Sequence, residues 1–132
     1  MIVYLDTSAA FKLLAAEAES EPLAAALTAL DPADVLLSSR LLFTELHCAA
    51  QRRSVWDVTA VNAVLEMITL ADVTREDLDR AATSGWGLRS ADAIHLATAL
   101  RMQSEVLAAY DRELCAVGES AGLRLLRPGA TA

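Results

Sequence analysis

Short runs of consecutive apolar residues alternate along the chain with segments of helical periodicity, and this order restricts the fold more than any single motif. The apolar runs predict strands at residues 1–5, 35–37, 68–73, 106–109 and 123–126. Capping residues and periodicity predict helices at about 7–16, 20–30, 40–53, 56–67, 75–84, 90–102 and from 111 to the glycines at 118 and 122. Strands that are apolar on both faces and separated by helices form parallel sheets covered on both sides. The prediction is therefore an α/β fold with three layers, α/β/α, around a mainly parallel sheet of about five strands.

Length and composition suit one domain over residues 1–132, because 132 residues with 55% apolar content can bury a single core. The chain has no apolar run of membrane-spanning length and no basic leader, so a cytoplasmic location is expected. Cys48 and Cys115 are too few for a disulfide framework and are interpreted as small buried thiols. The net charge of −7 argues against a sequence-reading DNA-binding protein, because nucleic-acid affinity comes mostly from phosphate neutralisation.

Four carboxylates occupy positions that a surface role does not explain. Asp6 directly follows a predicted strand and Asp111 comes shortly after another, although each is also placed to cap a helix. Glu45 projects from a largely apolar stripe of its helix, where the alternative is a buried ion pair with an arginine. Asp92 begins the most apolar helix, where the helix dipole alone favours an acid. The acids in polar runs are interpreted as surface groups: Glu17, Glu19, Glu21, Glu76, Asp77 and Asp79.

These four acids are expected at one place, because the carboxyl ends of parallel strands form the ligand crevice of an open α/β sheet. Asp6 and Asp111 become neighbours if the fourth strand pairs beside the first, and Glu45 and Asp92 lie on helices that can face that edge. Clustered carboxylates repel one another, so such a group either takes up protons or binds a cation. Ligands that are all oxygen favour Mg²⁺ or Mn²⁺, ions that commonly serve phosphoryl chemistry.

Four segments carry a family resemblance: Tyr4-Leu5-Asp6-Thr7-Ser8-Ala9, Thr44-Glu45-Leu46, the run from Leu88 to Ala99, and Tyr110-Asp111-Arg112-Glu113-Leu114. In order, spacing and total length the chain resembles the PIN-domain ribonucleases, and among them the VapC toxins of toxin–antitoxin pairs. The run LRSADAIHLATA at residues 88–99 is the most specific of the four.

The resemblance implies a PIN-like fold in which Asp6, Glu45, Asp92 and Asp111 form a Mg²⁺ or Mn²⁺ site. It also implies endonucleolytic cleavage of RNA, such as tRNA or rRNA, by metal-activated water. A homodimer and inhibition by a VapB-like antitoxin are the implied assemblies. The chain departs from the family at Ala109, where Thr or Ser often stands, and this makes Asp111 the least certain ligand.

Several polar and aromatic residues near these motifs have two interpretations. Thr7 and Ser8 can supply hydroxyls near the metal, and Arg89 either contacts RNA phosphate or forms a salt bridge with the acidic cluster, which is favoured. His95 is interpreted as a satisfied histidine packed in the helix layer, and Trp86 as a lid residue or a dimer contact. The remaining candidates for phosphate contact are interpreted as solvated surface residues: Arg52, Arg53 and Arg112.

Two rival functions are considered. A haloacid-dehalogenase-like phosphohydrolase would use Asp6 as nucleophile, but such chemistry needs a lysine late in the sheet, and the only lysine is Lys12. The usual second acid two residues after the nucleophile is Ser8 here. A non-catalytic PIN-like interaction protein is the other rival, and Ala109 is its only support.

Overall fold

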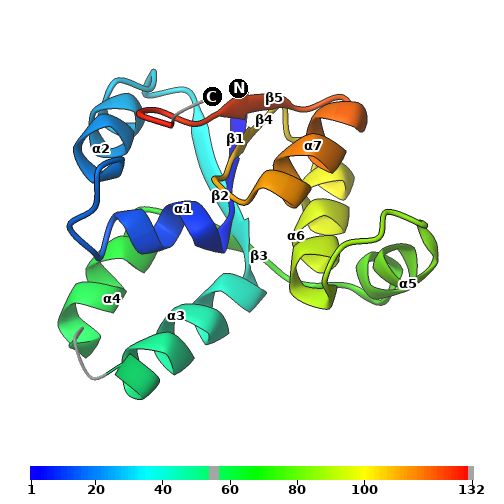
Figure 1. The fold of residues 1–132 in the computed structure, drawn as a ribbon, viewed down its shortest axis with the longest axis horizontal. Coiled ribbons are helices and arrows are strands. Elements are labelled where there is room, and N and C mark those ends of the chain that lie inside the picture. Colours follow the sequence, from blue (N-terminus) through cyan, green and yellow to red (C-terminus); the bar gives the residue numbers. More distant parts are fainter. Residues whose placement is uncertain (54–56, 131–132) are drawn as a thin grey trace.

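A parallel sheet of five strands runs through the described part of the chain, residues 1–53 and 57–130 of the computed structural model. The strands are β1 (Ile2–Leu5), β2 (Val35–Ser39), β3 (Thr69–Ala71), β4 (Val106–Ala108) and β5 (Arg124–Leu126). Their order across the sheet is β3-β2-β1-β4-β5, and every neighbouring pair is parallel (Figure 1). The predicted α/β class, the parallel pairing and the strand number are confirmed.

Helices cover both faces of the sheet (Figure 1). One face carries α1 (Thr7–Lys12), α2 (Ser20–Thr28), α3 (Arg40–Arg53) and α4 (Val58–Glu66). The other carries α5 (Arg75–Thr83), α6 (Ser90–Arg101) and α7 (Arg112–Ser120). The arrangement is the predicted three-layer α/β/α sandwich. None of the described helices is long and apolar enough to cross a membrane.

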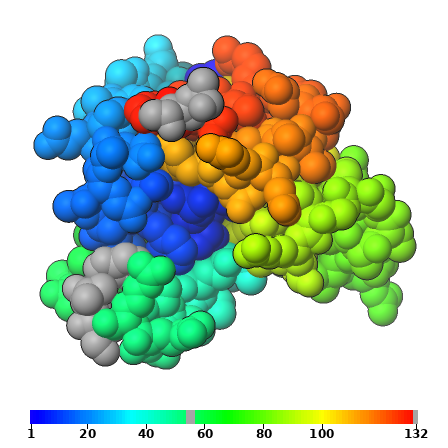
Figure 2. Space-filling model, viewed as in Figure 1, coloured from blue at the N-terminus to red at the C-terminus, as the bar shows by residue number. Residues whose placement is uncertain are grey.

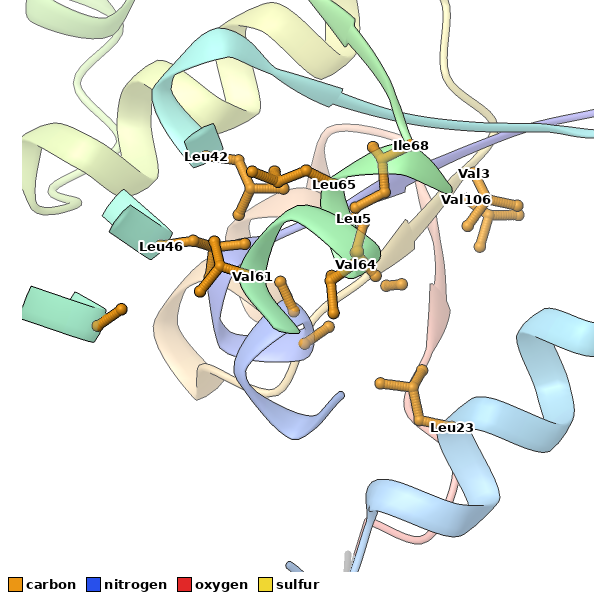
Figure 3. Packing of buried hydrophobic residues seen from close by; sticks show 14 residues of the cluster. Val3, Leu5, Leu23, Leu42, Leu46, Val61, Val64, Leu65, Ile68 and Val106 are labelled. Atoms are coloured by element: carbon orange, nitrogen blue, oxygen red, sulfur yellow. The ribbon is translucent and has the colours of Figure 1, made fainter. Parts of the chain in front are cut away.

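Two hydrophobic clusters, one on each face, hold the layers together. Alternate side chains of a strand point to opposite faces, so Val3 and Leu5 of β1 join the first cluster while Tyr4 joins the second. Figure 3 shows the first cluster, in which Leu42 and Leu46 of α3 gather with α4 side chains beside Leu5. Because β1 is buried on both faces, the turn that follows it is held in a fixed place in the molecule.

The observed ends of several elements differ from the predicted ones. Helix α1 ends at Lys12 rather than near residue 16, because the N–H groups of Leu13 and Leu14 bond to carbonyls three residues back, which tightens the last turn. Strand β2 continues to Ser39, since its last residues pair with β3. The predicted helix start at residue 56 lies outside the described residues, and Asp57 caps α4.

The sequence predicted that Gly118 would help to end the last helix, but Gly118 lies inside α7, which continues to Ser120. A Cβ atom at Gly118 would come within 2.7 Å of Leu107 Cδ2, so the glycine allows α7 to approach β4 closely. Gly122, with a φ of +103°, follows the helix in the left-handed region that favours glycine. The helix therefore ends where the backbone changes hand.

Two burial predictions are wrong. Asp77 was expected on the surface, but it is buried, and it accepts hydrogen bonds from Arg101 Nε at 2.8 Å and from Thr98 Oγ1 at 2.9 Å. These contacts join α5 to α6, and local polarity could not reveal partners that are more than twenty residues away. Of the two thiols, Cys115 is buried as expected, whereas Cys48 is exposed.

Candidate active site

Asp6 and Asp111 lie at the carboxyl ends of adjacent strands. Strands β1 and β4 pair in parallel, and the Asp6 N–H extends this pairing by donating to the Ala108 carbonyl at 2.9 Å. Each acid is also an N-cap: Asp6 accepts from the Ser8 N–H, and Asp111 accepts from the Leu114 N–H at 2.9 Å. Both residues therefore cap a helix, and the capping hydrogen bond uses one oxygen of each carboxylate.

The two carboxylate oxygens of Asp6 have different surroundings. Oδ2 accepts two hydrogen bonds from Ser8, from the N–H at 3.1 Å and from the hydroxyl at 2.7 Å. Oδ1 is buried and has no hydrogen-bond partner within the described part of the chain. The side chain is only 2% exposed. A buried carboxylate oxygen without a donor is unfavourable, and a cation is one of the few partners that can compensate it.

Glu45 reaches the same region from α3. Its Oε1 accepts from the Thr7 hydroxyl at 2.7 Å and lies 2.7 Å from Nε2 of His95. Burial raises the pKa of Glu45, but the His95 and Thr7 contacts outweigh it, so the pKa lies below the usual value. Because its ion-pair partner is a histidine, the alternative of a buried pair with arginine is wrong for Glu45.

Asp92 is in the first turn of α6, and burial and the negative charges of the other acids raise its pKa. Burial raises its pKa most, the charges of Asp6 and Asp111 raise it further, and the pKa reaches about 6. Glu45 acts in the same direction, while His95 opposes it. A carboxyl with so high a pKa is stabilised either by a proton or by a cation. The structure thus brings the four predicted acids into one electrostatic neighbourhood.

His95 makes more contacts than the sequence interpretation gave it. It is 1% exposed and its ring is satisfied, as expected, with Nδ1 2.7 Å from the Tyr4 hydroxyl. Its Nε2, however, contacts both Glu45 and, at 3.0 Å, the Thr7 hydroxyl. Burial lowers the pKa of His95, and the Glu45 contact and neighbouring acids raise it above the usual value. The spacing of three residues from Asp92, on the same helix face, was the available signal.

Among the described residues, Arg89, Arg112 and Lys12 form no ion pair with the four acids. Arg89 is exposed and forms no ion pair within residues 1–53 and 57–130, so the favoured salt bridge to the cluster is wrong. Arg112 is exposed, as predicted. Lys12 pairs with Glu17 and Glu19, which leaves no lysine beside the acids as a phosphohydrolase would need.

Hydroxyl groups reach the acids from the turn after β1. Ala109 is fully buried in the second cluster and has no hydroxyl to offer. Ser8 instead links the two turns, because its hydroxyl donates to Asp6 and accepts from the Tyr110 N–H at 2.9 Å.

In the space-filling view, the dark blue N-terminal segment reaches the surface between α3 and the segments coloured yellow and orange (Figure 2).

The residues suit a hard divalent cation by their chemistry. The buried, unpaired Oδ1 of Asp6 and the raised pKa of Asp92 both indicate a place for positive charge, and the donors are all oxygen. In the present rotamers, no three His, Cys, Asp or Glu side chains of the described residues converge as a ready ligand set.

Comparisons with known proteins identify the family of this chain. A family model described as PIN domain matches residues 3–120. Ribonuclease VapC35 of Mycobacterium tuberculosis is 35% identical over 135 residues, a match that covers 97% of this chain and 98% of the relative.

Solved structures give the same fold. VapC20 of Mycobacterium tuberculosis, described as a sarcin–ricin loop cleaving toxin, has a TM-score of 0.75 and 18% identity over 96% of this chain and 99% of that one. A toxin–antitoxin complex from Klebsiella pneumoniae has a TM-score of 0.65 and 19% identity over 83% of this chain and 86% of that one. With a family model over most of its length and a close match in sequence to VapC35, this chain belongs to the PIN domain family, and the VapC ribonucleases are its relatives there.

Proposed function

We propose that this chain is an endoribonuclease that depends on Mg²⁺ or Mn²⁺ and acts as the toxin of a toxin–antitoxin pair, with residues 1–132 working as one domain. The observation that carries the proposal is the environment of Asp6. Its carboxylate is buried at the carboxyl edge of the sheet, one oxygen has no donor among the described residues, and the charge of Asp6 raises the pKa of Asp92. The relationship to a named ribonuclease at 35% identity supports the same reaction class.

Asp6 and Asp92 are the proposed direct ligands, Glu45 is a ligand or a base that positions water, and Asp111 completes the site. A divalent cation held there would supply the positive charge that activates water and stabilises charge on the phosphodiester. Ser8 holds Asp6 through Oδ2, and Thr7 holds Glu45 through Oε1, so the hydroxyls orient the carboxylates.

Substrate and product of the proposed reaction differ by one water molecule. In the proposed step, the water attacks phosphorus in line with the leaving ribose oxygen and the P–O bond to that oxygen breaks. Glu45 would accept the proton of the water, and the leaving oxygen would take a proton from solvent. Exposed Arg89, at the start of α6, is the proposed contact for an RNA phosphate. Transfer RNA and ribosomal RNA are the proposed substrates.

The proposed partners are a VapB-like antitoxin and a second copy of this chain. The fold is shared with the toxin–antitoxin complex from Klebsiella pneumoniae. An acidic site in a chain of net charge −7 suits a basic segment of the antitoxin, with an arginine directed at the carboxylates. Because the proposed RNA substrates and antitoxin are cytoplasmic molecules, the proposed location of the activity is the cytoplasm.

The test uses antitoxin-free protein and a panel of tRNAs and ribosomal RNA fragments, with Mg²⁺, Mn²⁺ or EDTA. Cleavage is expected with either cation and is expected to stop in EDTA. Asp6→Asn, which keeps the size and capping ability of the side chain, should abolish cleavage and growth inhibition while the unfolding transition remains cooperative. A folded Asp6→Asn protein that still cuts RNA at the wild-type rate would overturn the site.

The alternative is a PIN-like interaction protein without catalysis. Two observations favour it: Ala109 replaces a hydroxyl residue, and the described acids are not arranged as a ready three-ligand set. Folded wild-type protein that binds an antitoxin but cuts no RNA with either cation would select this alternative.

A further inference from the structure

A chain of buried polar side chains lies directly behind Glu45. It begins at the hydroxyl of Tyr4, in the middle of β1, and passes through the imidazole of His95 to the Glu45 carboxylate. The Tyr4 hydroxyl is 2.7 Å from Nδ1, and Nε2 is 2.7 Å from Glu45 Oε1. Tyr4 is 0% and His95 1% exposed, so the tyrosine hydroxyl and the imidazole are shielded from water.

The partners of the ring decide where its protons are. An ionised carboxylate can only accept, so Nε2 must carry the proton that faces Glu45, whether the ring is neutral or charged. In the neutral ring, Nδ1 has no proton and then accepts from the Tyr4 hydroxyl, which lies 2.7 Å away. The ring also packs edge-to-face on Tyr4, with 5.8 Å between the centroids. Its orientation is thereby set by β1, at the centre of the sheet.

Both hydrogen bonds of Glu45, from Thr7 and from His95, fall on Oε1. The glutamate side chain has three rotatable bonds, and it would lose its single orientation without donors. With Oε1 held by two donors, Oε2 is the oxygen left to face a ligand.

We infer that His95, supported from behind by Tyr4, is the positioning residue that holds the Glu45 carboxylate in its active orientation. The inference rests on the proposed function, because it assigns to Glu45 a place in the cation site. His95 itself touches neither cation nor RNA. It acts by fixing an oxygen ligand, in the way that hydrogen-bonded neighbours orient the ligands of other metal sites.

Two substitutions of His95 separate this role from packing. The amide nitrogen of glutamine can occupy the place of Nε2, so His95→Gln keeps a donor toward Glu45. The amide of asparagine corresponds to Nδ1, so His95→Asn keeps a group toward Tyr4 and loses the donor. Binding of Mn²⁺ alone is measured by titration calorimetry and electron paramagnetic resonance. His95→Asn should weaken Mn²⁺ binding by about 10–100-fold, and His95→Gln should restore most of it.

Leu96→Val is the control for lost packing, since Leu96 is buried in the second cluster and has no part in this chain of polar groups. It should lower the unfolding temperature without changing Mn²⁺ affinity. With RNA and saturating Mn²⁺, His95→Asn should lower kcat more than it changes KM. Equal Mn²⁺ affinity in His95→Asn and wild type would overturn the inference.

A measurement without metal keeps the two proposals distinct. A ¹H–¹⁵N spectrum of the His95 ring should show a proton on Nε2 that exchanges slowly with water, and Glu45→Ala should remove this protection. A ring with no proton on Nε2 would overturn the inference even if RNA is cleaved. Wild-type protein that neither binds Mn²⁺ nor cuts RNA would overturn the proposed function, while the spectrum would still decide whether His95 holds Glu45.

Discussion

The backbone N–H of Tyr110 donates a 2.9 Å hydrogen bond to the hydroxyl of Ser8, which itself donates to Asp6 Oδ2 at 2.7 Å. One hydroxyl therefore fastens the turn after β4 to the turn after β1 and holds a proposed cation ligand between them.

Ser8→Ala is expected to weaken both the fold and the site. It leaves the half-buried Tyr110 N–H without its acceptor, which should lower the free energy of unfolding by about 1–3 kcal/mol. It also removes the shorter of the two hydrogen bonds that hold Asp6 Oδ2, so Mn²⁺ affinity should fall. Ser38→Ala is the matched control, because it removes a buried hydroxyl bond to the Leu5 carbonyl without touching Asp6. Equal loss of Mn²⁺ affinity in both variants would contradict the role of Ser8.

Asp111 caps α7 and also contributes a negative charge to the proposed cation site. Two substitutions separate these two roles. Asp111→Asn keeps the acceptor for the Leu114 N–H, so stability should change little, while Mn²⁺ affinity should fall. Asp111→Ala should lower the free energy of unfolding by about 1 kcal/mol as well. Asp57→Ala, which removes the cap of α4, should cost a similar amount and leave Mn²⁺ binding unchanged. Unchanged Mn²⁺ affinity in Asp111→Asn would remove Asp111 from the site.

Asp92 should make the metal-free protein less stable as the pH rises. Its folded pKa of about 6 lies above the ordinary 3.8, so the stabilising contribution of the protonated carboxyl is complete below about pH 4 and is lost as the pH rises through about 6. In EDTA at pH 7.5, Asp92→Asn should therefore raise the free energy of unfolding by about 1–2 kcal/mol, after allowance for partial exposure.

Urea denaturation in EDTA at pH 4 and at pH 7.5 measures this effect, and the difference between variant and wild type should shrink at the lower pH. Adding Mn²⁺ at pH 7.5 should stabilise the wild type and not Asp92→Asn. A difference that grows toward pH 4 would show that the charge of Asp92 is compensated in the fold without a cation.

The buried Asp77 pair should be important for stability and irrelevant to the site. Arg101→Met removes both guanidinium hydrogen bonds to Asp77 and leaves the Asp77 carboxylate buried without its cation. The free energy of unfolding should therefore fall by about 2–4 kcal/mol. Burial raises the pKa of Asp77, but Arg101, the Thr74 N–H and Thr98 outweigh it and lower the pKa, so this stability should be lost as the pH falls below about 4. Chemical denaturation across pH 3–7 checks both, and a change in Mn²⁺ affinity per folded molecule would contradict the separation.

Strand and helix types could be predicted from the sequence because each depends on local pattern. The buried apolar runs around Val3 and Leu107 predicted strands of a parallel sheet, and the structure confirms both the layers and the pairing. The ends of elements were less well determined: α1 ends four residues early, where Leu13 and Leu14 donate to carbonyls three rather than four residues back. Such an end is decided by a contact that periodicity does not contain.

The sequence by itself determined which residues are chemically able to form a site: acids placed directly after strands or within apolar helices, as Asp6 and Asp92 are. Only the tertiary structure decided their partners. It gave Glu45 a histidine where an arginine had been the alternative, left Arg89 without an ion pair among the described residues, and buried Asp77. The physical reason is range: strand and helix preferences act between neighbours in the chain, whereas the Tyr4–His95 and Thr7–Glu45 bonds join residues 91 and 38 positions apart that meet only when the layers pack.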